Sequence, residues 1–183
     1  MRRIIASEMV TVDGFFSGPN GELDWFVQDE ELDRFATDLI NAVDTILYGR
    51  ATYQMMAGYW PHAGGDFAEQ TNQLPKLVFT STLDETPWGE WGNARPVNGQ
   101  LAEEIVKLKN EPGGDMVIYG SGSSVQALSR LGAIEEYRLV VNPVLLGAGR
   151  PLFEGPAGRR SLRLVESASW PSGCLALTYR PAD

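Results

Sequence analysis

The stretch MVIYGSGSS, residues 116–124, decides the fold of this 183-residue chain. Its four leading apolar residues predict a short buried strand, and the glycines that follow end the strand in a tight turn. Apolar residues then recur at helical spacing, so a helix is expected directly after the turn, with its buried face formed by Val125, Leu128 and Leu131. A buried strand that turns directly into a helix is the repeating unit of α/β proteins.

Further segments of the same kind lie on both sides of this stretch. Short apolar runs predict strands over residues 4–12, 45–48, 76–80, 137–141, 162–165 and 175–179, and helical spacing predicts helices over 32–40 and 101–109. Strands that alternate with helices form parallel sheets covered on both faces, whereas the last two strands have no helix between them. We therefore predict an open α/β fold whose sheet is mostly parallel, with an antiparallel C-terminal edge.

Length and composition are those of one folded domain, residues 1–183. A single cysteine, Cys174, excludes an intrachain disulfide, and a single histidine, His62, leaves no zinc-ligand pattern. The net charge of −9, from 15 basic and 24 acidic residues, argues against nucleic acid as a partner. There is no run of about 18 apolar residues, and the first residues soon turn polar. We expect no membrane segment, no signal peptide and a cytoplasmic location.

The turn Gly120-Ser121-Gly122 is a candidate anion-binding site. Open α/β sheets bind ligands where strands end and helices begin. A helix N-terminus there offers unpaired N–H groups and a positive dipole end, and Ser123 or Ser124 can cap it. The same residues equally fit a plain strand-to-helix turn, because the full G-x-G-x-x-G pattern is absent.

Two other predicted strands also end in polar residues. Residues 49–53 (GRATY) follow one of them, and the guanidinium of Arg50 is suited to a phosphate. Thr80, Ser81 and Thr82 end another with three hydroxyl groups. The alternatives are an Arg50 paired with a nearby acid and an ordinary turn at 80–82. Carboxyl ends of parallel strands share one edge of the sheet, so the three strand ends together favour a nucleotide site.

Several motifs, in order, resemble a known family. Residues 7–14, 21–26 (GELDWF) and 47–53 (LYGRATY) resemble the dihydrofolate reductase-like superfamily. Residues 118–122 (IYGSG), 131–138 (LGAIEEYR) and 142–147 (NPVLLG) resemble its riboflavin-biosynthesis branch, the RibD C-terminal domain family, in a form without the zinc deaminase segment. This resemblance implies a three-layer α/β/α fold of the dihydrofolate reductase type, NADPH as cofactor, and hydride transfer to a heterocycle or imine-like carbon.

The resemblance also implies roles for individual residues. It assigns Gly49, Arg50 and Thr52 to the nicotinamide and adenosine-phosphate side, and Thr80 and Ser81, followed by Thr82, to the ribose 2′-phosphate. The pyrophosphate is assigned to residues 120–123, and the flanking Tyr119 and Ser124 are also expected to be cofactor-binding residues. The relatives have two or three adjacent glycines in this turn, whereas this chain has Ser121 between Gly120 and Gly122. Ser121 is therefore expected to adopt a strained backbone conformation.

Candidate substrate-binding residues come from the aromatic and basic side chains of the chain. Trp25, Phe26 and Tyr53 are aromatic candidates for stacking on a planar heterocycle, although Trp25 is equally suited to anchoring its own loop. The expected substrate resembles 5-amino-6-(5-phosphoribosylamino)uracil, and Arg150, Arg159 and Arg160 are candidates for its phosphate. The alternatives are a dihydrofolate, pteridine or other imine or carbonyl reductase, and a non-catalytic NADPH-binding module.

Asp33 is the candidate proton-handling carboxylate. It lies at the margin of the apolar face of its predicted helix, where partial burial raises a carboxyl pKa, and it stands 17 residues before Arg50. The alternative is an ordinary helix acid paired with Arg34 or Thr37. The relatives pair as homodimers, so a homodimer is expected, with the apolar segment 145–153 as a contact surface or, alternatively, as packing within the monomer.

Overall fold

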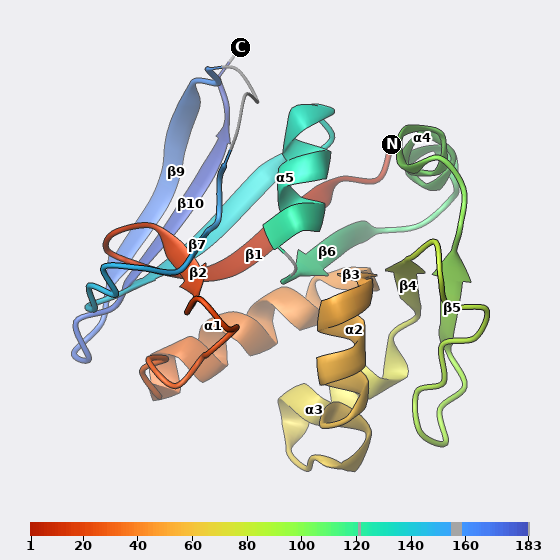
Figure 1. Ribbon diagram of the computed structural model, residues 1–183, viewed down its shortest axis with the longest axis horizontal. Coiled ribbons are helices and arrows are strands. Elements are labelled where there is room, and N and C mark those ends of the chain that lie inside the picture. The colour runs from red at the N-terminus through yellow and green to blue at the C-terminus, as the bar shows by residue number, and fades with distance from the viewer. Residues whose placement is uncertain (121, 155–158, 183) are drawn as a thin grey trace.

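An eight-stranded sheet forms the centre of the molecule in the computed structural model, which describes residues 1–120, 122–154 and 159–182 (Figure 1). In spatial order its strands are β5 (Ala94–Val97), β4 (Lys76–Phe79), β3 (Val43–Gly49), β6 (Asp115–Tyr119), β1 (Ile4–Thr11), β7 (Glu136–Asn142), β10 (Leu175–Pro181) and β9 (Leu162–Ser169). Neighbours from β5 to β7 pair in parallel, whereas β10 pairs antiparallel with both β7 and β9. The predicted parallel sheet with an antiparallel C-terminal edge is confirmed.

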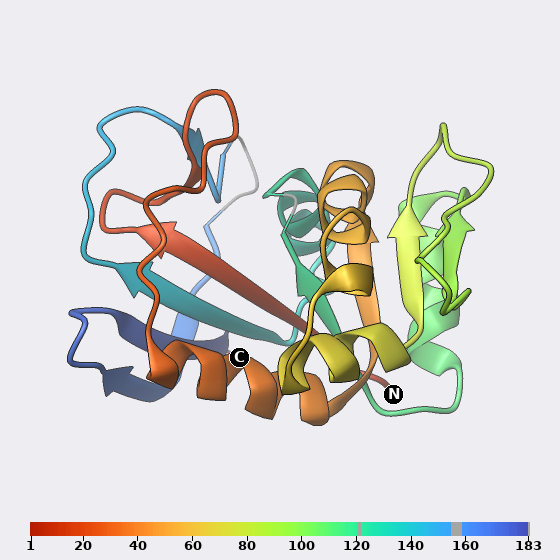
Figure 2. The ribbon, with the colours of Figure 1, turned by 90° about the horizontal axis from the view of Figure 1, so that it is seen from below.

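Helices cover both faces of the sheet and complete three layers. Helices α1 (Glu30–Asn41), α2 (Arg50–Ala57) and α3 (Asp66–Gln73) contribute to the core on one face, and α4 (Leu101–Asn110) and α5 (Gly122–Arg130) to the core on the other. Figure 2 shows α1 and α3 side by side below the sheet. None of the helices in the described part of the chain is long and apolar enough to cross a membrane.

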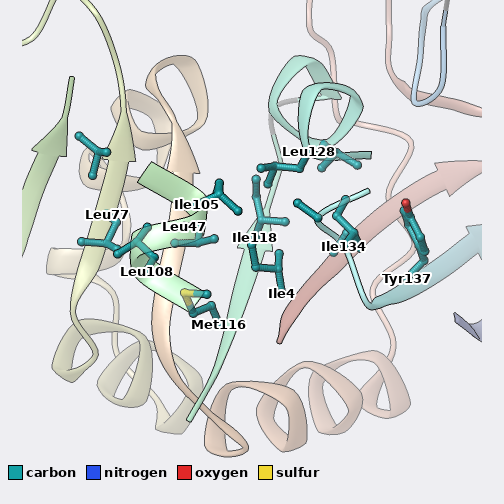
Figure 3. Close-up of a cluster of buried hydrophobic side chains, with 14 of the residues drawn as sticks. Ile4, Leu47, Leu77, Ile105, Leu108, Met116, Ile118, Leu128, Ile134 and Tyr137 are labelled. Atoms are coloured by element: carbon teal, nitrogen blue, oxygen red, sulfur yellow. The ribbon is translucent and has the colours of Figure 1, made fainter. Parts of the chain in front are cut away.

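Alternation along the central strands separates two hydrophobic clusters. In β3, Ile46 belongs to the cluster under α1 and Leu47 to the cluster under α4 and α5, because adjacent residues of a strand point to opposite faces. Figure 3 shows the second cluster, in which Ile105 of α4 and Leu128 of α5 lie against Ile118 of β6 and its neighbours. Strands buried on both faces explain why the sequence shows continuous apolar runs rather than alternation.

The start of α1 follows from its sequence. Asp29 accepts a hydrogen bond from the backbone N–H of Glu31 at 2.8 Å, which satisfies one of the unpaired donors of the first turn. Acidic residues in that turn lie near the positive end of the helix dipole. Leu39 and Ile40, in the last turn of the helix, are fully buried in the core cluster on this face of the sheet.

Several short elements have no counterpart in the sequence prediction: α3, β5, the 3-10 turn Trp60–His62, and the two-stranded sheet of β2 (Phe15–Ser17) and β8 (Arg150–Pro151). Strand β5 is an edge strand that contains a proline and an exposed arginine, so no apolar run marks it. Trp88 packs within the core and stacks on Tyr48, His62 is exposed and Cys174 is buried.

Candidate functional site

A cavity of about 540 Å³ opens at the carboxyl edge of the sheet, where β3, β4, β5 and β6 end. It brings together Arg50, the three hydroxyl residues 80–82, Ser123 and Ser124, all of which the sequence singled out from separate strand ends. The sequence did not single out the remaining lining residues, which are Ala51, Phe79, Val97, Asn98, Gly99 and Leu101. No acidic residue is among the described residues that line the cavity, although the chain carries a net charge of −9.

Three helices begin at this cavity. The first residues of α2 and α4, Arg50 and Leu101, line it, and so do Ser123 and Ser124 in the first turn of α5. The residues before α2 and α4 make no side-chain capping bond, so the first N–H groups of these helices have no side-chain acceptor at the cap. Uncapped helix starts that share one cavity provide donors and a positive potential for an anionic ligand.

Arg50 supplies a full positive charge at the same place. Its Nη1 donates to Thr82 Oγ1 at 3.1 Å, and none of the ion pairs among the described residues includes Arg50. The alternative of an Arg50 neutralised by a local acid is therefore wrong for this part of the chain. Thr80 Oγ1 accepts from the backbone N–H groups of Thr82 and Leu83, at 3.2 and 3.1 Å, and so fixes the turn that presents exposed Ser81 and Thr82.

The glycines of the β6–α5 turn allow close packing. Gly120 has φ of +59°, and a Cβ there would lie 2.9 Å from Thr52 Cγ2. A Cβ on Gly122 would lie 2.3 Å from Cε1 of Phe16, whose ring covers the start of α5. Thr52 is itself buried, so its side chain supports the turn from below. The prediction for Ser121 lies outside the described residues.

Tyr119 and Gly49, two of the predicted cofactor residues, are not among the described residues that line the cavity. The Tyr119 ring packs in the cluster under α1 and α3 and contacts Phe67 edge to face, and its buried hydroxyl has no hydrogen-bond partner among the described residues. Burial raises the pKa of this hydroxyl well above its ordinary value. Gly49 ends β3 and precedes α2. Tyr119 therefore has its side chain in the core, and a role of Tyr119 and Gly49 in cofactor binding stays a prediction.

The three aromatic residues predicted for the substrate do not gather at the cavity. Tyr53 is 5% exposed, and its hydroxyl donates to the carbonyl of Pro87 at 2.6 Å, so it is a core residue, and its predicted place in a cleft is wrong. Trp25 is also buried, and its Nε1 donates to the carbonyl of Glu22 at 3.2 Å. This contact favours the alternative in which Trp25 anchors its loop. Phe26 packs against Trp25 edge to face with centroids 4.5 Å apart and stays half-buried.

The loop that contains Trp25 and Phe26 is held in place by a hydrogen bond from the end of β7. Asn142 is fully buried, and its Oδ1 accepts from the backbone N–H of Val27 at 3.0 Å. Asp13 makes a similar connection, because its carboxylate accepts from the backbone N–H of Gly147 at 2.8 Å and from Thr11 Oγ1 at 2.6 Å. These hydrogen bonds hold the pKa of Asp13 below its ordinary value. Asp13 thus shapes its own turn through Thr11 and ties that turn to the segment at Gly147.

Asp33, Arg150 and Arg160 are not among the described residues that line the cavity. Asp33 is exposed on α1, so the partial burial expected for it is wrong, and Arg34, its expected partner, pairs with Glu31 at 2.6 Å. Arg150 is exposed on β8, and Arg160 donates to the carbonyl of Arg130 at 2.9 Å. A role for Asp33 in proton transfer stays a prediction.

Comparisons with known proteins agree with this architecture. A model of the RibD C-terminal domain family matches residues 2–176. The YyaP protein of Bacillus subtilis (strain 168) is 36% identical over 183 residues, which cover 97% of this chain and 94% of YyaP. A crystal structure from Shewanella sp. PV-4, described as that of a riboflavin biosynthesis protein, has a TM-score of 0.84 at 24% identity and 99% coverage of both chains.

Dihydrofolate reductase from Enterococcus faecalis, in a complex with NADP(H), has a TM-score of 0.67 at 16% identity, with 99% of this chain and 97% of that chain covered. At this identity the likeness shows a shared fold, which is the dihydrofolate reductase-like fold expected from the motifs. The family model extends over nearly the whole length and agrees with the strand-end motifs at residues 47–53 and 118–122. The chain therefore belongs to the RibD C-terminal domain family.

Proposed function

We propose that this protein is an NADPH-dependent reductase that transfers a hydride to a small planar heterocycle, with a ribosylaminopyrimidine of the riboflavin type as the first candidate. The observation that supports it most is the acid-free cavity into which Arg50, a hydroxyl turn and three helix starts project. Membership of the RibD C-terminal family and the likeness to a dihydrofolate reductase in complex with NADP(H) support the same class of reaction.

The residues present fit a phosphorylated dinucleotide. Arg50 and the hydroxyls of Ser81 and Thr82 suit a ribose 2′-phosphate, because a guanidinium beside hydroxyl donors binds a dianion. The start of α5, with Ser123 and Ser124, suits the pyrophosphate. When bound, the cofactor supplies the hydride. The protein residues bind its phosphates and orient its nicotinamide.

A binding module that holds NADPH without turnover is the second candidate. The observation in its favour is that Asp33 is exposed and that no carboxylate or histidine is among the described residues of the cavity lining. Proton transfer to a reduced heterocycle needs a group within reach of the substrate or an ordered water. If Asp33 supplies this proton, Asp33→Asn lowers turnover while the dissociation constant for NADPH is unchanged.

Two measurements test the proposal. Fluorescence titration with NADPH and NADH measures cofactor binding, and absorbance at the NADPH band follows turnover with the ribosylaminopyrimidine and with dihydrofolate in turn. We expect NADPH to bind and the pyrimidine to be reduced faster than dihydrofolate. Faster reduction of dihydrofolate reverses the order of substrates. Binding without oxidation of NADPH by any heterocycle, imine or carbonyl compound supports the binding module, and absence of binding contradicts both candidates.

A further inference from the structure

Glu8 on β1 is a buried carboxyl group that the proposed function does not use. It is 6% exposed, and its Oε1 has no hydrogen-bond partner among the described residues. Because Ser7 pairs with Tyr119 across β1 and β6, the next residues along the two strands, Glu8 and Gly120, lie side by side. Burial of an unpaired carboxylate is costly, so a carboxyl group at this position favours its neutral form.

The contact of Glu8 with the β6–α5 turn is direct. The backbone N–H of Gly120 donates to the Glu8 carboxyl group. Ala6 and Val10, which share a strand face with Glu8, belong to the core cluster under α4 and α5. Glu8 therefore lies on the α5 side of the sheet, beneath the turn that leads to the helix start at Gly122.

We propose that Glu8 is a positioning residue that couples proton binding to anion binding at the start of α5. In its neutral form Glu8 holds Gly120 through one oxygen and leaves the helix start available to a phosphate. In its ionised form it occupies the same positive region with its own charge and repels the phosphate. The inference rests on the proposed function, because the phosphate is that of NADPH.

A carboxylate near the start of a helix interacts favourably with the same positive dipole end that would bind a phosphate. Two negative charges a few ångströms apart repel strongly where water is excluded. Linkage then requires the reciprocal effect, so a bound phosphate makes ionisation of Glu8 less favourable.

The surroundings of Glu8 favour ionisation of its carboxyl group at a slightly alkaline pH rather than near pH 4.5. Burial raises its pKa to about 8, and the hydrogen bond from Gly120 lowers it by less. Tyr137 on β7 and Tyr179 on β10 share this face of the sheet. The charged side chains of the nearby helices are Arg130 on α5, Arg50 on α2, and Glu103, Glu104, Lys107 and Lys109 on α4. Strand β2 has no charged residue. None of these groups, in the part of the chain that the structure describes, contributes to the pKa of Glu8.

The test is NADPH binding between pH 7 and pH 9.5 in the wild type, in Glu8→Gln and in the control Glu166→Gln, whose residue is exposed on β9. Glutamine keeps an acceptor for Gly120 and does not titrate. The wild type and the control should bind about tenfold more weakly at pH 9 than at pH 7, and Glu8→Gln should bind equally at both. The second pKa of a phosphate monoester is about 6, so the titration of the ligand itself contributes little over this range.

Calorimetry in buffers of different ionisation enthalpy gives a second readout. At pH 8 the wild type should take up about half a proton for each NADPH bound, and Glu8→Gln about none. Carbon NMR of the wild type should show a higher Glu8 pKa with NADPH than without it, a measurement that needs no variant. Burial lowers the pKa of Lys76 to about 7, so this residue titrates in a similar pH range. Because Lys76 is present in every variant, its contribution drops out of the difference between variants.

The outcomes separate the two proposals. NADPH binding that is independent of pH in the wild type, or equally pH-dependent in Glu8→Gln, overturns the role of Glu8 and leaves the NADPH site intact. Absence of NADPH binding at every pH overturns the proposed function, and this inference with it.

Discussion

Arg50 and Thr82 are 32 residues apart in the sequence, yet Arg50 Nη1 donates to Thr82 Oγ1 at 3.1 Å. The contact forms because β3 and β4 are parallel neighbours with Gly49 opposite Phe79, so the residues that follow both strands meet at one edge. A guanidinium group thus lies directly beside a turn of hydroxyl side chains. This pairing underlies the first prediction.

We expect NADPH to bind at least about tenfold more tightly than NADH, a difference of roughly 1.4 kcal/mol. Arg50→Ala should remove most of this difference, because NADH lacks the 2′-phosphate that the guanidinium would bind. Arg163→Ala, a change of an exposed arginine on β9, serves as the control and should leave the ratio unchanged. Equal dissociation constants for the two cofactors in the wild type would show that Arg50 does not select the phosphate.

Gly120→Ala should lower the free energy of unfolding by about 1–3 kcal/mol, because alanine is strained at positive φ and its Cβ would crowd Thr52. Gly64→Ala is the matched control, since a Cβ there meets nothing within 4 Å. Urea denaturation measures both. Adding Thr52→Ala to Gly120→Ala should recover the steric part of the loss but not the backbone part, and strictly additive effects of the two changes would argue against the contact.

Glu8 should also make stability depend on pH. Its folded-state pKa of about 8 lies above the ordinary value of 4.5, so the folded state binds the proton more tightly than the unfolded state. The free energy of unfolding should therefore fall as the pH rises from about 4.5 to about 8, by about 1.4 kcal/mol for each pH unit over which the two states differ in protonation.

Chemical denaturation at a series of pH values tests this expectation. Glu8→Gln should lose the decline over that interval, whereas Glu166→Gln should follow the wild type. Lys76 acts in the opposite direction between about pH 7 and pH 10.5, because its folded-state pKa is lowered, and the difference between variants again removes its contribution. Parallel curves for the wild type and Glu8→Gln would mean that Glu8 is already ionised in the folded protein.

We predict a homodimer in solution, with the segment 145–153 in the contact. Leu145 is 73% exposed and Phe153 is 49% exposed, whereas Leu152 between them is buried within its own chain. Exposed apolar side chains within one segment are typical of contact surfaces. Light scattering at micromolar concentration should give twice the mass of 20.1 kDa, and Leu145→Asp should reduce it. A monomer mass for the wild type would refute the prediction.

Some of the site could be predicted from the sequence because its signals are local. A short apolar run that ends in glycine, such as Ile118 to Gly120, specifies a strand and a turn through backbone preferences that act within a few residues. Arg50 and the hydroxyls at 80–82 were recognised because each directly follows such a run. Their convergence could be expected, since parallel strands place all their carboxyl ends at one edge.

Only the tertiary structure decided which side chains face the site. Asn98 and Leu101 line the cavity through β5 and α4, yet β5 pairs at the sheet edge without an apolar run of its own. Tyr53 and Trp25 looked suited to a ligand, but partners such as Pro87, far along the chain, hold Tyr53 in the core.

Glu8 is the clearest example of a residue whose environment could not be predicted from the sequence. In the sequence it is one acid in an apolar strand, and its burial depends on Leu139 of β7, on the turn at Gly120 and on the helix that follows. The sequence by itself determined the apolar central strands, their turns and the family, because these depend on neighbouring residues, whereas it did not reveal the short strands β2, β5 and β8. The tertiary structure decided burial and protonation, because these depend on atoms brought together from distant parts of the chain.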